Sequence, residues 1–295
     1  MGFEICCNKK SSPDSSQSFA GSTEKEIAVQ KYSSSNDDFF AEIEKKYNIL
    51  TYIQLVEYIN LLEYFTLDTA TVPFEGQMKT EYSSKDEFLN HPISVDEFQS
   101  FIENQLLKVK EIYEMAGNNE LMVTTFKAGF IELYNSLKTK LNQHYGKDKN
   151  FDIITKRALI PLGILFTISN VVGKIKLIFD IFKDENGNFV KSNELDEYLL
   201  SSFLLCSYCI VSTRNKISKT NSSISEMSKE DLIKCLQVSE LKDCQNLVKV
   251  FNEKFFKKDS YNWSEFKEQF EKKSDGFQWI LSPSGIRSKL EENNV

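Results

Sequence analysis

The chain has 295 residues, of which 41% are hydrophobic and 13% aromatic, enough to bury one large core or two ordinary ones. Its formal net charge of −7 opposes a general attraction to phosphate backbones, and no basic patch stands out, so we expect no nucleic acid among its partners. The sequence also lacks GxSxG, HExxH and glycine-rich phosphate-binding motifs and has only two histidines. These features favour a globular protein that is not an enzyme.

The first ten residues, "MGFEICCNKK", contain the elements of a membrane anchor. Gly2 is an acceptor for N-myristoylation, and Cys6 and Cys7 are candidates for palmitoylation. One myristoyl chain binds a membrane only marginally, so stable attachment needs a second signal, which this decapeptide contains. The longest apolar stretch, residues 158–172, is too short and too interrupted to span a bilayer, and we expect it to form a buried helix. We therefore expect a cytoplasmic protein held peripherally at a membrane.

Residues 8–36 are rich in serine and poor in aromatic residues, so they cannot bury enough surface to offset the entropy of ordering. We predict that residues 1–36 form an acylated, flexible tether. From residue 37 onward, apolar residues recur at steps of three and four, which predicts one long helix that continues through residues 52–65.

Helical periodicity returns along the rest of the chain, at 95–115, 124–143, 153–181, 192–212, 229–255 and 264–273. Strand patterns are scarce, so the predicted fold class is all-α, with an N-terminal helical half at 37–150 and a C-terminal half at 151–295. Cys206 and Cys209 fall on one face of an apolar helix, which predicts packed core thiols instead of zinc ligands. The C-terminal stretch "GFQWIL" at 276–281 is too apolar to remain in water and should pack against the helices.

One stretch, "KIKLIFDIFKDENGNFVKSNELDEYLL" at 174–200, reads as a helix, a polar loop and a second helix. An EF-hand loop has twelve residues, with oxygen ligands at positions 1, 3, 5, 7, 9 and 12, a tight turn at 6 and an apolar residue at 8. If Gly187 is the turn residue, Phe182 occupies position 1 and Asn193 occupies position 12. This register lacks the glutamate that binds calcium through both carboxylate oxygens.

A second register places Glu194 at position 12 and Val190 at the apolar position 8. Lys183 then occupies position 1, where its ammonium disfavours a cation, and Asn188 takes the turn. Neither register supplies a full ligand set, so we expect calcium to bind weakly or not at all. The candidate ligands are Asp184, Glu185, Asn186, Asn188 and Glu194.

The residues "FDIF", "DENGNF" and "NELDEY" resemble the EF-hand superfamily, and residues 165–182 are similar in layout to a third hand of the recoverin and neuronal calcium sensor group. The resemblance implies paired helix-loop-helix units, calcium as a possible cofactor, and a protein partner that binds through an apolar groove. Acylated EF-hand proteins with this organisation lie at plasma or flagellar membranes, so the resemblance implies a similar location here.

EF-hands stack in pairs through a short antiparallel bridge between their position-8 residues, so the resemblance predicts partners for this loop. We expect Val190 to lie beside Tyr261, or Phe189 to take that place if Gly187 is the turn residue. A weaker pair is expected between Ile93 and Leu121. In these further candidates Glu97, Thr125 and Glu265 occupy position 12.

Three functions are compatible with these features. The preferred one is a membrane-tethered EF-hand-like adaptor that binds a partner's helix. The second is a working calcium sensor in which weak binding at 183–194 opens the partner groove. The third is an all-α scaffold unrelated to EF-hands.

Overall fold

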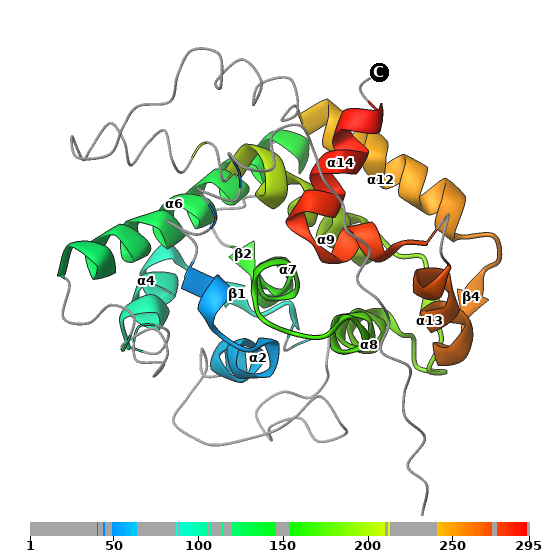
Figure 1. The fold of residues 1–295 in the computed structure, drawn as a ribbon, viewed down its shortest axis with the longest axis horizontal. Helices are drawn as coiled ribbons and strands as arrows, with labels where there is room; N and C mark the ends of the chain where they lie inside the picture. The colour runs from blue at the N-terminus through cyan, green and yellow to red at the C-terminus, as the bar shows by residue number, and fades with distance from the viewer. Residues whose placement is uncertain are drawn as a thin grey trace, which may run out of the picture.

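The computed structural model describes residues 40, 44, 49–63, 87, 89–104, 107, 114, 120–145, 154–209, 212, 241–272 and 276–293. The described part of the chain is mostly helical, which confirms the predicted fold class (Figure 1). Its α-helices are α2 (Leu55–Glu63), α4 (Val95–Asn104), α6 (Glu120–Tyr145), α7 (Lys156–Phe166), α8 (Val171–Phe182), α9 (Asn193–Leu204), α12 (Leu241–Phe255), α13 (Trp263–Glu271) and α14 (Pro283–Asn293). The tether predicted at 1–36, including Gly2, Cys6 and Cys7, lies outside the described residues.

Short elements complete the architecture. Two 3-10 helices, η1 (Ile49–Tyr52) and η5 (Gln278–Leu281), and a π-helical turn, η4 (Leu205–Cys209), extend or connect the α-helices. Four two-residue strands, β1 (Pro92–Ile93), β2 (Ile154–Thr155), β3 (Phe189–Val190) and β4 (Ser260–Tyr261), form two separate antiparallel pairs, β1–β2 and β3–β4. Each strand lies within three residues of the start of a helix, so each pair joins two helix N-termini.

Helix α7 lies at the centre of the molecule, with α2, α8 and α9 around it (Figure 1). All its residues are buried, as predicted for the apolar stretch that begins at 158. Gly163 allows α2 to approach closely, because a Cβ atom there would lie 2.4 Å from the Tyr58 ring. The Tyr58 hydroxyl donates a hydrogen bond to the Leu159 carbonyl at 3.0 Å, which fixes the same contact. The α2–α7 contact is therefore a close-packed part of the described core.

Two predicted helices are interrupted, and the backbone segments at the two interruptions are hydrogen-bonded to each other. The helix predicted to run through 52–65 is broken between η1 and α2, and the one predicted at 153–181 is two helices, α7 and α8. Gln54 and Ile168 form an isolated parallel bridge, in which Leu55 N donates to Ile168 O at 3.0 Å and Ile168 N donates to Ile53 O at 2.8 Å. Asn170 then caps α8 by accepting a hydrogen bond from Gly173 N at 2.7 Å. Backbone pairing between distant segments overrides the local helical pattern here.

The C-terminal segment packs against the helices, as predicted. Phe277, Trp279, Ile280 and Leu281 are all buried. The Trp279 ring stacks on Phe203, with 5.7 Å between ring centroids. Cys206 and Cys209 are also buried and free of disulfides, which confirms them as core thiols. The division of the chain at residue 150 stays a prediction.

No helix in the described ranges combines the length and apolar character needed to cross a bilayer.

Candidate functional site

The candidate site is the β3–β4 pair and the two loops that lead into it, which we call the paired loops (residues 183–192 and 256–262). The first loop joins α8 to α9 and the second joins α12 to α13. Phe189 lies opposite Tyr261, and Val190 lies opposite Ser260. The bridge predicted between these loops is therefore confirmed in the register with Phe189. The prediction that Val190 faces Tyr261 is wrong by one residue.

The turn in the first loop explains this register. Gly187 has a backbone φ of 77°, a left-handed conformation that glycine adopts without steric cost. Gly187 N donates to Asp184 O at 3.0 Å, and Asp184 N donates to Asn188 O at 2.8 Å. The Asp184 carboxylate accepts a further bond from Asn188 N at 2.8 Å. The turn therefore closes on its own backbone, with the Asp184 carboxylate as part of the closure.

The helix that follows begins later than the EF-hand spacing implies. Ser192 is the N-cap of α9 and accepts a hydrogen bond from Leu195 N at 3.2 Å. In the second loop the N-cap, Asn262, comes directly after the strand residue Tyr261. In the first loop two residues separate Phe189 from Ser192, so its helix starts two residues later, relative to the paired strand residue, than the helix of the second loop. This start is also one residue later than the register with Val190 at position 8 would give.

The predicted calcium ligands do not converge. Glu194 lies in the first turn of α9, where hydrogen bonds from its own backbone amide and from the Ser192 hydroxyl lower its carboxyl pKa. Glu185 and Asn186 are exposed at the tip of the turn. Within the described residues, no group of three or more histidine, cysteine, aspartate and glutamate side chains is arranged to hold a metal ion. Asp184 and Asn188 are the two candidates that the turn brings together.

A lysine ammonium meets a carboxylate at the base of each loop. Lys183 Nζ lies 2.8 Å from the carboxylate of Asp180, a largely buried residue one turn back on α8. Lys176 Nζ lies 2.9 Å from the same oxygen. In the second loop Lys258 Nζ lies 2.5 Å from Glu265, the residue predicted at position 12. These ammonium groups supply positive charge inside the paired loops.

Glu265 also completes a capping box at the start of α13. The Asn262 side chain accepts a hydrogen bond from Glu265 N, and the Glu265 carboxylate accepts one from Asn262 N, both at 3.0 Å. The hydrogen bond from Lys258, together with the one from the Asn262 amide, lowers the pKa of the Glu265 carboxyl. This carboxylate is therefore already engaged by the helix start and by a cation from its own loop.

Aromatic rings fill the space beneath the paired loops. Phe189 lies 4.3 Å from Phe266, 5.7 Å from Phe255 and 6.4 Å from Phe179, measured between ring centroids. Phe266, Phe255 and Phe189 are all at most 1% exposed. Aromatic contacts of this kind contribute about 0.5–1.5 kcal/mol each beyond the area they bury. The pair of loops therefore rests on a packed aromatic core.

The second strand pair corrects another prediction. Ile93 lies opposite Ile154, not Leu121. Leu121 and Thr125 lie inside α6, which begins at Glu120 and continues unbroken to Tyr145. Sequence reasoning missed Ile154, although "DIIT" at 152–155 is a β-branched run next to a helix, the signal that identifies a short strand.

Glu97, predicted at position 12 after Ile93, behaves like Glu265. Its carboxylate accepts a hydrogen bond from Ser94 N at 2.7 Å, while Ser94 Oγ accepts one from Glu97 N at 3.2 Å. This bond from the Ser94 amide lowers the pKa of the Glu97 carboxyl. In both strand pairs, then, a glutamate three residues after the N-cap stabilises the start of a helix.

Comparison of the chain with protein-family models, with curated proteins and with solved structures finds no match.

Proposed function

We propose that the protein is a membrane-tethered, EF-hand-like adaptor whose paired loops are held by internal contacts without calcium and whose helical body binds a partner protein. The observation that carries the proposal is the antiparallel pairing of Phe189 with Tyr261 between two helix-loop-helix units. Position-8 residues meet in this way in EF-hand pairs, because the bridge satisfies backbone groups that the loops otherwise leave unpaired.

The N-terminal half supports the same interpretation. Strand β2 lies between α6 and α7, and β1 directly precedes α4, so Ile93 and Ile154 pair at two further helix starts. The four strands therefore pair in chain order, the first with the second and the third with the fourth. This is the arrangement expected of two EF-hand pairs. An unrelated all-α scaffold has no reason to repeat this pattern, so we favour it less.

The charges in the paired loops favour an adaptor over a calcium sensor. Calcium at an EF-hand loop needs several oxygen ligands, including a carboxylate at position 12. Here Glu265 binds Lys258 and the cap of its helix, and Glu194 is engaged at the start of α9. With Gly187 at the turn, position 1 is the buried side chain of Phe182. A sensor would have to break several of these contacts before calcium could bind.

We place the partner contact at the junction between the two interrupted helices. Among the described residues, Val56 and Ile168 are large apolar residues with high solvent exposure, at 65% and 49% of their accessible surface. The hydrogen bond from Leu55 N to Ile168 O brings their backbone segments together. Exposed apolar side chains on two neighbouring backbone segments are the kind of surface onto which a partner helix can lay its apolar face.

The tether completes the proposal. Acylation at Gly2, Cys6 and Cys7 would hold the chain at a membrane through two lipid signals, and the net charge of −7 would keep the helical body from lying flat on anionic lipid. We propose no catalytic activity and no nucleic-acid partner. The location that follows is the cytoplasmic face of a plasma or flagellar membrane.

Proximity labelling in cells with the full-length protein tests the proposal. We expect the wild type to label a set of membrane-associated neighbours that stays the same when calcium is chelated. Gly2→Ala combined with Cys6→Ser and Cys7→Ser should release the protein from membranes. Val56→Ser with Ile168→Ser should lose the partner while membrane attachment is kept, and the exposed Lys249→Gln serves as the matched control. A neighbour set that changes with calcium would favour the sensor instead, and a lipid-site variant that stays with membranes would refute the tether.

A further inference from the structure

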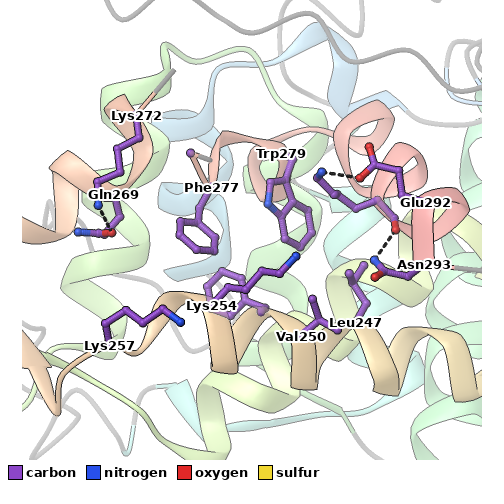
Figure 2. Close-up of a pocket in the computed structure, with 13 residues that line it drawn as sticks. Leu247, Val250, Lys254, Lys257, Gln269, Lys272, Phe277, Trp279, Glu292 and Asn293 are labelled. Carbon is purple, nitrogen blue, oxygen red and sulfur yellow. Dashed lines mark hydrogen bonds and ion pairs between the residues drawn. The ribbon is translucent and has the colours of Figure 1, made fainter. Parts of the chain in front are cut away.

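A cavity of about 470 Å³ lies between α12 and the C-terminal segment (Figure 2). Its apolar wall comes from both sides: Leu247, Val250 and Phe251 belong to α12, and Phe277 and Trp279 belong to the C-terminal segment. Phe251 lies 5.3 Å from Phe277 and 6.2 Å from Trp279 between ring centroids, so the rings form one continuous surface. The volume falls in the range of about 300–1,000 Å³ that is usual for small-molecule sites.

The rim of this cavity is basic although the chain as a whole is acidic. The described residues that line it include four lysines, Lys254, Lys257, Lys272 and Lys289, and one acid, Glu292. The four positive charges and one negative charge give a local net charge of +3, against −7 for the chain. Lys289 Nζ lies 2.6 Å from Glu292, so one lysine is neutralised within the rim.

The other three lysines are divided between the two ends of the cavity. In Figure 2, Lys257 and Lys272 lie at the end opposite Glu292, whereas Lys254 extends across the front of the cavity and carries its ammonium group below Trp279, toward Glu292. Lys257 Nζ donates to Glu253 O at 2.9 Å, and Lys272 Nζ donates to Gln269 Oε1 at 2.8 Å. Both acceptors are uncharged, and an ammonium group has three donors, so each lysine keeps its charge and spare donors. Apolar rings at the back and ammonium groups at one end are complementary to a molecule that is itself apolar with one anionic end.

We propose that this cavity binds an amphipathic organic anion, a single molecule with an aliphatic or aromatic body and a carboxylate or phosphate head. The body lies against Phe277 and Trp279, and the head lies at the end of the cavity that carries Lys257 and Lys272. The volume suits one small molecule better than a partner helix, which has a diameter of about 10–12 Å with its side chains. Lys257 belongs to the second of the paired loops, but the other lining residues lie outside both loops and away from Val56 and Ile168, so the proposal does not depend on the proposed function.

Trp279 provides a direct test, since it lines the cavity and the chain has only one other tryptophan, Trp263. In the full-length Trp263→Phe protein, titration with laurate below its micelle concentration should produce a saturable change in Trp279 emission. Lauryl alcohol has the same apolar body without the charge, and we expect it to bind at least tenfold more weakly. Equal binding of laurate and lauryl alcohol would overturn the proposal.

Charge variants locate the site. Lys257→Gln with Lys272→Gln, in the Trp263→Phe background, should weaken laurate binding by about tenfold, the size expected for two partly exposed charge-assisted contacts. The matched control is Lys249→Gln, an exposed lysine on α12 outside the cavity lining, which should leave the affinity unchanged. An unchanged affinity in the double variant, or an equal loss in the control, would place laurate elsewhere and refute the assignment.

A third arm separates a free amphiphile from a lipid in a bilayer. Vesicles of phosphatidylserine mixed with phosphatidylcholine should give a smaller Trp279 response than soluble laurate, because a buried cavity wall cannot reach acyl chains inside a bilayer. A Trp279 response to the vesicles but not to laurate would contradict the proposal and assign the basic rim to a membrane surface.

Discussion

Each of the two strand pairs is supported by a tyrosine hydroxyl, but the hydroxyl does a different job in each. In the N-terminal pair, Tyr134 of α6 donates to Ile93 O at 2.7 Å and accepts from Ile154 N at 3.5 Å, so one hydroxyl contacts both strands. In the C-terminal pair, Tyr261 is itself a strand residue. Its hydroxyl donates to Phe255 O at 2.6 Å and accepts from Lys257 N at 3.0 Å, so it closes a single loop.

The difference shows what holds the C-terminal strands together. Since Tyr261 closes only its own loop, cohesion between β3 and β4 comes from the aromatic rings around Phe189 and from the C-terminal segment packed nearby. The N-terminal pair depends instead on α6, which lies beside both strands through Tyr134. The same backbone pairing is thus reached by two different sets of side chains.

Truncation after Lys273 should have the largest effect, because the removed segment belongs to the core that supports the C-terminal pair. It removes the buried side chains of Trp279, Ile280, Leu281, Ile286 and Leu290. At about 1.5–3 kcal/mol for each buried side chain, the loss is on the order of 10 kcal/mol, comparable to the whole stability of a typical domain. We expect Trp263 to become exposed and native-like near-ultraviolet circular dichroism to be lost. Removal of residues 294–295 alone is the control, and an unchanged melting curve for the longer truncation would show that the segment is not core.

Gly163→Ala should destabilise the α2–α7 contact on the opposite side of the core. The new Cβ would lie 2.4 Å from Tyr58 Cδ1 and 2.7 Å from Cε1, and the Tyr58 ring is buried and cannot move aside freely. Overpacking of this kind costs about 1–3 kcal/mol. Urea unfolding of the variant measures the cost. Gly173→Ala, where the nearest atom is a movable serine hydroxyl, should change stability by less than about 0.5 kcal/mol.

Tyr134→Phe and Tyr261→Phe compare the two pairs directly. Each leaves a buried backbone carbonyl without its hydroxyl donor, which should cost about 1–2 kcal/mol. Hydrogen exchange distinguishes them: Tyr134→Phe should speed exchange at the Ile154 amide in β2, whereas Tyr261→Phe should speed exchange at the Lys257 amide and leave β1–β2 unchanged. Equal effects on both strand pairs in either variant would contradict the separate roles given to the two hydroxyls.

Alkaline pH should weaken the helix that supports the C-terminal pair. Burial raises the pKa of the Cys244 thiol on α12 to about 12, from an ordinary value of 9.0. The unfolded thiol therefore loses its proton at a lower pH than the folded one, so stability falls as the pH rises above about 9. Between pH 9 and 10 the wild type should lose about 1 kcal/mol more than Cys244→Ala in urea unfolding under reducing conditions. Parallel pH profiles for the two proteins would show that this thiol does not contribute.

Much of the fold follows from local patterns in the sequence. The amphipathic repeats predicted α4, α6, α9 and α13, and the apolar run after 158 predicted the buried helix α7. The breaks at 53–54 and 167–170 were not predictable locally, because they depend on hydrogen bonds between segments more than a hundred residues apart. The predicted pairing of Leu121 failed because the polar sequence around Asn118 was interpreted as a loop that includes Leu121. In the structure Leu121 lies in the first turn of α6.

The paired loops show which features of the candidate site could be predicted from the sequence and which could not. Sequence spacing correctly joined the loop at 183–192 to Tyr261, since both lie next to helix starts with apolar residues at the expected place. The choice between Phe189 and Val190 depended on which residue takes the left-handed turn, and Gly187 decided it. The ion pair of the Glu265 carboxylate could not be predicted from the sequence, because Lys258 and Glu265 come together only in the folded second loop.

The most direct test of the account is calorimetric titration of the full-length protein with calcium. If internal contacts hold the paired loops, we expect no binding tighter than about 10⁻⁵ M, the weak end of the sensor range. Lys183→Asp should leave the titration unchanged, because in the register set by Gly187 Lys183 takes position 2, which supplies no ligand, and its ammonium contacts Asp180. Submicromolar calcium binding that is removed by Glu194→Gln would contradict the account and establish the loop at 183–194 as a working calcium site.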